Sequence, residues 1–89
     1  MPSVRIPPPY RGPTLGAAEI EAEGGTVGVV LDWVERKHPG FLAQVLDDDG
    51  NVHRFVKLFK NGEHLVRDQL RTPLAAGDEL EIIAAIAGG

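Results

Sequence analysis

One amphipathic stretch, TVGVVLDWVERKHPG, constrains the fold of this chain more than any other feature. Its apolar residues recur at helical spacing, which predicts a helix with one buried face. These residues are Val27, Val30, Leu31 and Val34. Thr26 can cap the first turn with its side-chain oxygen, and Pro39-Gly40 ends the helix. A helix of this kind depends on packing its apolar face against another element.

Strand-like alternation precedes this helix. The segment SVRI alternates polar and apolar residues, and AAEIEAE does so again after the turn-like segment RGPTLG. Pro7–Pro9 cannot donate to a sheet ladder, so the first strand ends there or runs along an edge. We expect the two strands to pair antiparallel across the turn.

Three more strands are predicted after the helix. HRFVKLFK is rich in aromatic and branched residues, and Asn61-Gly62 is the strongest short hairpin signal. EHLV is then the return strand, and ELEII is the last strand, with Leu80 and Ile82 facing one way. Between helix and strands, FLAQVL is compatible with a short second helix.

This order of elements predicts a single domain of the α+β class over residues 1–89. We expect a mixed sheet of about four to five strands packed on one main helix, the roll called the β-grasp. The flexible C-terminal tail is predicted to cover residues 84–89.

Composition disfavours several classes of function. The net charge of −4 argues against nucleic-acid binding, which needs clustered Lys and Arg. The sequence has 0 cysteines, so it can form no disulfide and offers no thiol nucleophile or thiolate ligand. No apolar run reaches the length of a membrane span, and MPSVRIPPPYRG does not resemble a signal peptide. We therefore expect a cytoplasmic protein.

The polar residues suggest no catalytic or metal site. His38, His53 and His64 match no zinc template, and DDDGN does not fit a calcium loop. No serine or threonine has a histidine–acid pair placed by sequence. We expect no metal ion, no stably bound cofactor and no enzyme acting alone.

The strand HRFVKLFK has apolar residues on both faces. Val56 and Leu58 lie on one face, and Phe55 and Phe59 lie on the other. Because one helix covers one face of a sheet, the other face would carry Phe55 and Phe59, or else Val56 and Leu58, with Ile83 nearby. An exposed apolar patch of this kind usually marks a partner site. The alternative is that FLAQVL folds over that face. The sequence leaves both possibilities open.

The sequence ends in AAIAGG. Glycine has no Cβ, so Gly88-Gly89 could enter a narrow channel and present an unhindered carboxylate. If a partner enzyme adenylated Gly89, a sulfur nucleophile could replace AMP and leave a thiocarboxylate. A chain without cysteine could carry sulfur in this way. The alternative is a tail without function.

The segment TPLAAGDELEIIAAIAGG resembles the C-terminal signature of the ubiquitin-like sulfur carriers. These include the small subunit of molybdopterin synthase and the thiamine-pathway carrier. The matching positions are Pro73-Leu74, Gly77-Asp78-Glu79, Leu80 to Ile83 and Gly88-Gly89. FKNGEHL also looks like the family's third-strand hairpin, so the resemblance covers essentially the whole chain.

The resemblance implies the β-grasp fold and the role of a sulfur carrier. It implies that an E1-like adenylating enzyme uses ATP to activate Gly89 and that sulfur transfer follows. It also implies that the tail and outer-face apolar residues dock the partner enzyme. These residues are Gly88, Ala87, Ile86, Ile83, Phe59 and Phe55.

Two details favour one branch of the family. Ala84-Ala85 stand where the molybdopterin subunit usually has Pro-Pro, and HRFVKLFKNGE looks more like the cysteine-pathway carrier. That resemblance implies a cysteine synthase homologue as the downstream sulfur acceptor. One alternative is a small subunit that works with the large subunit of molybdopterin synthase. Others are a protein modifier joined through Gly89 to lysines of its targets, and a β-grasp interaction module with an idle tail.

Overall fold

The structure is a computed structural model that describes residues 1–84. It contains one sheet, two α-helices and two short 3-10 helices. In chain order the elements are β1 (Ser3–Arg5), η1 (Pro8–Tyr10), β2 (Glu19–Glu21), α1 (Val27–Lys37), α2 (Leu42–Val45), β3 (Val56–Lys60), β4 (Glu63–Leu65), η2 (Gln69–Arg71) and β5 (Glu79–Ala84).

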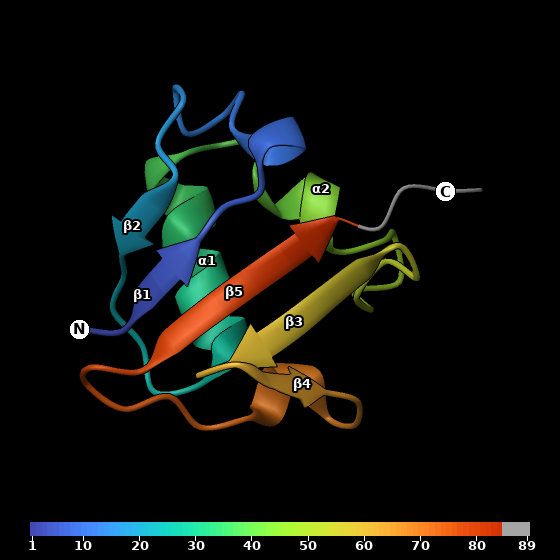
Figure 1. The fold of residues 1–89 in the computed structure, drawn as a ribbon. Coiled ribbons are helices and arrows are strands. Elements are labelled where there is room, and N and C mark those ends of the chain that lie inside the picture. Colours follow the sequence, from blue (N-terminus) through green and yellow to red (C-terminus); the bar gives the residue numbers. More distant parts are fainter. Residues whose placement is uncertain (85–89) are drawn as a thin grey trace.

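The sheet has five strands in the order β2-β1-β5-β3-β4 (Figure 1). β1 and β5 are parallel, whereas β1–β2, β3–β4 and β3–β5 are antiparallel. The predicted mixed sheet and the antiparallel pairing of the first two strands are therefore confirmed. β5 lies in the middle of the sheet, so the end of the described chain emerges from between β1 and β3.

α1 and α2 lie on the same side of the sheet (Figure 1). The core forms between this side of the sheet and the helices, and Phe41 is the largest of its fully buried side chains. Other core residues come from β1, α1, β3 and β5, including Val4, Leu31, Leu58 and Leu80. Within residues 1–84, no helix covers the opposite side of the sheet, which we call the open face.

The predicted helix begins and ends as its sequence indicates. Thr26 is extended and its hydroxyl accepts a hydrogen bond from the backbone N–H of Val29 at 3.3 Å. At the other end, the N–H of His38 donates to the carbonyl of Val34 at 2.7 Å. The four residues of the predicted apolar stripe are all buried: Val27, Val30, Leu31 and Val34.

We expect Thr26→Ala to destabilise the protein by about 1 kcal/mol, because it removes the side-chain acceptor that caps α1. Thr26→Ser keeps an oxygen in the same place and is the matched control. Urea unfolding followed by circular dichroism would measure both. Equal unfolding midpoints for Thr26→Ala and the wild type would show that the cap contributes nothing.

The hairpin between β3 and β4 is confirmed. Asn61 and Gly62 both have positive φ, 50° and 85°, as a two-residue turn of the I′ type requires. The return strand is short, however, and pairs only from Glu63 to Leu65. Leu65 lies opposite Leu58, so β3 continues beyond the end of β4.

Two predicted boundaries are corrected. β3 begins at Val56 rather than His53, because the preceding residues bond to the α2 segment: Leu46 bridges to Val52, and the N–H of His53 donates to the carbonyl of Val45 at 2.9 Å. Ala84, predicted to start the tail, instead pairs with Val56 as the last residue of β5. We use "tail" below for residues 85–89.

Candidate functional site

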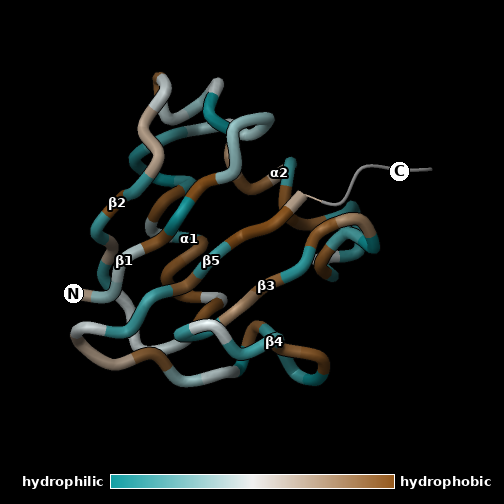
Figure 2. Tube along the Cα trace, in the orientation of Figure 1, coloured by the Kyte–Doolittle hydropathy of each residue, from teal (hydrophilic) through white to brown (hydrophobic). Residues whose placement is uncertain are grey.

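The candidate site starts at the C-terminal end of β5. The predicted carrier residue Gly89 and the neighbouring residues Gly88, Ala87 and Ile86 lie outside the described residues. The structure describes the base from which they extend. Figure 2 shows that β5 becomes hydrophobic toward this end.

β5 is fixed by the side chains that it buries. Leu80 and Ile82 are 0% and 2% exposed and face the helices, as their alternation predicted. Ile83 and Glu81 face the other way, in register with Lys57 and Phe59 of β3. The base of the tail is therefore a central, well-packed strand.

Ile83 and Phe59 lie on the open face, one of the arrangements that the sequence left open. Phe59 is half-buried and stacks on the ring of His64, with the ring centroids 4.9 Å apart. Ile83 is 37% exposed and lies diagonally from Phe59 across the β3–β5 pair. These two residues form an apolar patch beside the base of the tail.

Phe55 is placed differently from Phe59. It belongs to the turn before β3 rather than to the strand, and it is 41% exposed. The guanidinium carbon of Arg54 lies 5.0 Å from the centre of its ring. Phe55 therefore lies at the edge of the sheet, with its ring against the Arg54 guanidinium. It does not belong to the apolar patch that Phe59 and Ile83 form on the strands.

The position of FLAQVL decides between the two possibilities for the open face. Phe41 and Val45 are buried in the core, and α2 packs beside α1 on the helix side of the sheet. Among residues 1–84, no part of this segment covers Phe59 or Ile83. The apolar patch is therefore open.

A polar clamp holds the start of β5. The side-chain amide of Asn61 donates to Asp78 Oδ1 at 3.0 Å, and Asn61 Oδ1 accepts from the N–H of Glu79 at 2.8 Å. Asp78 Oδ2 accepts from the N–H of Ala75 at 2.7 Å and lies 3.8 Å from Lys60 Nζ. The clamp joins the β3–β4 turn to the loop before β5. Sequence reasoning used Asp78 only as part of a resemblance and missed this role.

The clamp lowers the pKa of the Asp78 carboxyl. The largest cause is the hydrogen bond from the N–H of Ala75, followed by the one from Asn61 and a smaller attraction to Lys60. Each of these interactions favours the charged carboxylate over the neutral acid. The charged form is therefore the one that fixes the loop before β5.

We expect Asp78→Ala to lower the melting temperature by a few degrees at neutral pH, because the variant loses the clamp. Since the folded-state pKa of Asp78 is lowered, its contribution is present above the unfolded-state pKa and is lost as the pH falls through the folded-state value. The difference between wild type and variant should therefore shrink in acid. Thermal unfolding across pH measures it, and a difference independent of pH would contradict this account.

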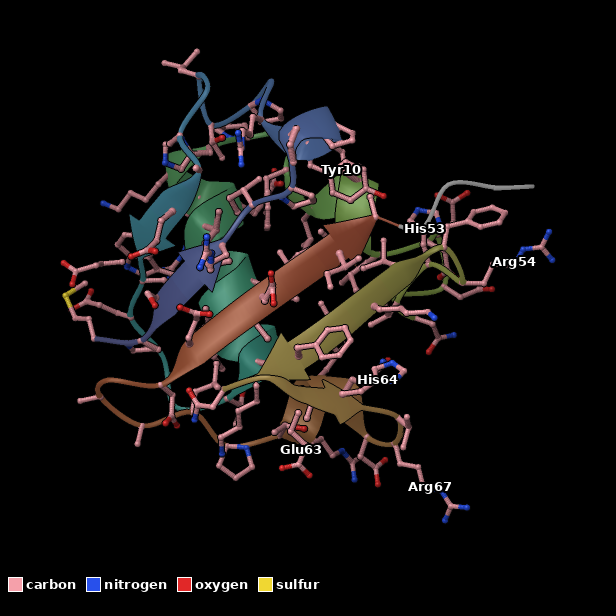
Figure 3. The ribbon with its side chains drawn as sticks, in the orientation of Figure 1. Tyr10, His53, Arg54, Glu63, His64 and Arg67 are labelled. Carbon is pink, nitrogen blue, oxygen red and sulfur yellow. The ribbon has the colours of Figure 1, made fainter. Side chains whose placement is uncertain are left out.

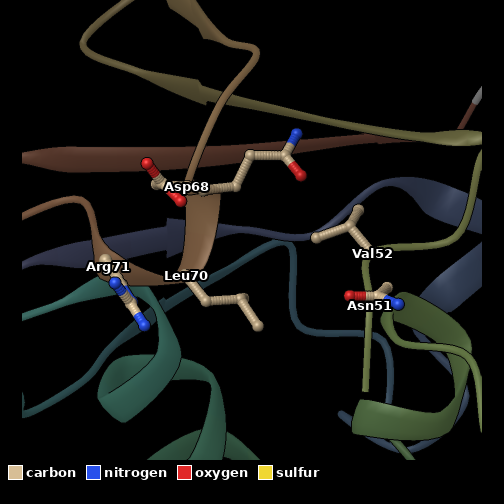
Figure 4. A pocket seen from close by; sticks show the side chains of 6 residues that line it. Asn51, Val52, Asp68, Leu70 and Arg71 are labelled. Carbon is tan, nitrogen blue, oxygen red and sulfur yellow. The ribbon is translucent and has the colours of Figure 1, made fainter. Parts of the chain in front are cut away.

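Two hollows lie outside the open patch, and Ile83 of the patch also lines the first of them. A groove of about 400 Å³ runs between Pro7–Pro9 and β5, with Arg5 and Glu81 in its lining. Another, of about 360 Å³, lies between η2 and the loop before β3 (Figure 4). There, the charged groups of Asp68 and Arg71 point away from Val52 on the facing loop, so the polar groups do not converge.

Comparison with known families decides what kind of domain this is. The profile of the ThiS family matches residues 10–89. This chain belongs to the ThiS family. Together with the β-grasp fold, the match identifies it as a ubiquitin-like sulfur carrier.

Individual relatives agree with the family. The sulfur carrier protein CysO of Mycobacterium tuberculosis is 34% identical over 90 residues, which cover 98% of this ThiS-family chain and 97% of CysO. Small archaeal modifier protein 1 of Haloferax volcanii is 34% identical over 71 residues, covering 79% of this chain and 78% of the relative. Both sulfur carriers and protein modifiers are therefore among its relatives.

Solved structures show the same similarity. In the crystal structure of the Amycolatopsis orientalis BexX/CysO complex, a chain aligns with a TM-score of 0.90 and 36% identity, with 100% of both chains covered. The crystal structure of M. tuberculosis CysO gives a TM-score of 0.90 at 31% identity, covering 97% of this ThiS-family chain and 100% of that one. The predicted β-grasp fold is confirmed.

Within the described part of this ThiS-family chain, no helix is long and apolar enough to cross a bilayer.

Proposed function

We propose that this protein carries sulfur as a thiocarboxylate on Gly89 and that the sulfur is used in cysteine biosynthesis. The observation that carries the proposal is its similarity to sulfur carrier protein CysO over 98% of the chain. The absence of cysteine supports it, because the sequence then offers no thiol on which sulfur could travel.

The proposed chemistry needs two steps in a partner enzyme. An E1-like adenylating enzyme binds ATP, and the Gly89 carboxylate attacks the α-phosphate and releases pyrophosphate. A sulfur nucleophile then attacks the acyl carbon, and AMP leaves with one of the carboxylate oxygens. This protein is the co-substrate and supplies no catalytic group. ATP belongs to the partner, and the carrier itself binds no cofactor stably.

The described residues suggest how the partner is engaged. β5, the strand before the tail, lies in the centre of the sheet and carries Ile83 of the open patch. In this proposal the partner enzyme docks on the patch while the tail enters its active site. Docking of a rigid surface a few residues before Gly89 in the chain would limit the positions that its carboxylate has to search.

For the downstream step we propose a cysteine synthase homologue as the sulfur acceptor, in the cytoplasm. The similarity to CysO favours this over the large subunit of molybdopterin synthase, with which the carrier would instead form a synthase complex. The similarity to small archaeal modifier protein 1 supports one further candidate, conjugation through Gly89 to lysines of other proteins.

The test is intact-mass measurement. The full-length protein is incubated with the adenylating enzyme from its own genome, ATP and sulfide, and is expected to gain the mass of sulfur minus oxygen. Adding the cysteine synthase homologue and an activated serine should then give a cysteine adduct on Gly89. An unchanged mass with an enzyme that releases pyrophosphate would contradict the carrier role, and isopeptide adducts in cells would instead support the modifier.

We expect Ile83→Glu to lower kcat/KM for thiocarboxylate formation about tenfold or more, because it places a charge in the proposed docking patch. The matched control is Val29→Glu, a similarly exposed apolar residue on α1, at 50% exposure against 37%. Both variants should melt near the wild-type temperature. Equal kcat/KM for the two variants would show that the partner enzyme does not dock on the patch.

A further inference from the structure

A second surface beside the tail is basic. A hollow of about 310 Å³ lies between residues 52–57 and residues 64–69, and we call it the basic groove. Its ionisable side chains are His53, Arg54, Lys57 and His64. Within the described chain, no aspartate or glutamate lines it. This is unusual in a protein whose net charge is −4.

The basic groove exists because β4 is shorter than β3. β4 ends at Leu65, opposite Leu58, so Val56 and Lys57 have no partner residue on β4. After β4 the chain turns away, leaving Val66 72% exposed at the edge of the hollow. The start of β3 and the chain after β4 are therefore not paired with each other, and a partner could insert side chains between them.

The basic groove lies next to the base of the tail. Val56 and Lys57 pair directly with Ala84 and Ile83, so one strand spacing of about 4.8 Å separates the groove from the strand that carries the tail. Figure 3 shows His53 and Arg54 at the end of the sheet toward which β5 points, and His64 beside β4. The basic groove is continuous with the open patch through Lys57 and Ile83.

Within residues 1–84, Arg54 and Lys57 of this groove form no salt bridge, and the carboxylate nearest to Lys57 in register is that of Glu81, diagonally across the β3–β5 pair. Other cations of the sheet are paired more closely. Lys60 lies 3.8 Å from Asp78, and Arg5 is in register with Glu81 and Glu19 on the two adjacent strands. Acidic residues line the adjoining hollows instead. Asp68 lines the one in Figure 4, which shares Val52 and Gln69 with the basic groove, and Asp47 lines one beside α2, which shares His53.

Arg54 is also preorganised. Its guanidinium lies 5.0 Å from the centre of the Phe55 ring, an arrangement that favours one position of a long side chain. A cation held in this way loses less conformational freedom when it binds an anionic group.

We propose that the basic groove binds an acidic segment, rich in Asp and Glu, on the adenylating enzyme and thereby steers the tail to that enzyme. This inference rests on the proposed carrier function. Nucleic acid is a poor fit because the chain as a whole is acidic and would be repelled by phosphates. Complementary charge at an interface accelerates association and makes it sensitive to salt.

The experiment measures thiocarboxylate formation by intact mass, with the adenylating enzyme from the same genome, ATP and sulfide, at increasing carrier concentration. Arg54→Glu/Lys57→Glu is expected to lower kcat/KM about tenfold or more at about 0.05 M salt, with little change in kcat at saturation. The loss should shrink toward about 0.5 M salt, where the charges are screened.

The control is Arg36→Glu/Arg71→Glu, which changes the net charge equally at two exposed cations of α1 and η2. It should stay within about twofold of wild type. Equal effects of the two double variants, or a loss independent of salt, would overturn the inference while leaving the carrier function intact. An unmodified wild-type protein would instead overturn the carrier function and, with it, this inference. If Arg54→Glu/Lys57→Glu does not fold, Arg54→Gln/Lys57→Gln can be compared with the wild type at the same two salt concentrations.

Discussion

Deleting Gly89 is expected to abolish thiocarboxylate formation while leaving the folded domain unchanged. The variant still ends in a glycine carboxylate, but that carboxylate lies one residue, or about 3.5 Å of extended chain, short of its proposed place in the partner's active site. A misplacement of about 1 Å can already lower a rate about a hundredfold, because the reacting atoms no longer meet. Formation should therefore fall by at least about that factor.

A companion variant is Gly88→Val, which keeps the chain length and adds a branched side chain. It tests whether the channel requires a small residue as well as a given length. Both variants should melt at the wild-type temperature, because the described core lies entirely within residues 1–84. Conversion of the deletion variant at the wild-type rate would show that the reacting carboxylate need not be that of Gly89.

Phe41→Ala is expected to destabilise the protein by about 3–5 kcal/mol, the largest loss for a single core residue. Phe41 is 0% exposed and belongs to the same core cluster as Val34 and Val45. Removing its ring leaves a cavity that α1 and α2, held by their own contacts, can only partly fill. Small domains are stable by about 5–15 kcal/mol, so a large share of the total would be lost.

Urea unfolding checks this prediction. The midpoint should fall with little change in the slope, since the surface exposed on unfolding is nearly the same. Val29→Ala is the control, because Val29 is 50% exposed and its truncation should cost less than about 0.5 kcal/mol. If both variants lost a similar free energy of unfolding, Phe41 would contribute no more to stability than an exposed residue.

Local patterns in the sequence predicted the parts of the fold that depend on local interactions. The cap at Thr26, the buried stripe of α1 and the Asn61-Gly62 turn each follow from a few neighbouring residues, and each is present. The order of elements predicted a mixed sheet, but the parallel pairing of β1 with β5 was not predicted. No short-range pattern specifies it, because the two strands are far apart in the chain.

The sequence analysis was wrong where distant contacts compete with local preference. Residues before Val56 have strand-forming side chains, but their backbone bonds to the α2 segment instead. The clamp between Asn61 and Asp78 joins two loops and has no periodic pattern. At the candidate site, alternation correctly separated Phe59 from Leu58 and Ile83 from Ile82, but only the β3–β5 register shows that Phe59 and Ile83 share a face. The exposed position of Phe55 depends on where β3 begins. The proposed roles of these residues stay predictions.

The central position of β5 has a consequence for how the protein is made. The β1–β2 and β3–β4 pairs can each form from neighbouring segments, but β5 joins them and is synthesised after both. The two halves of the sheet therefore stay unjoined until the last strand is available, and pairing β1 with β5 closes nearly the whole chain into one loop. A chain cut before β5 would therefore leave two separate pairs of strands rather than a smaller complete sheet.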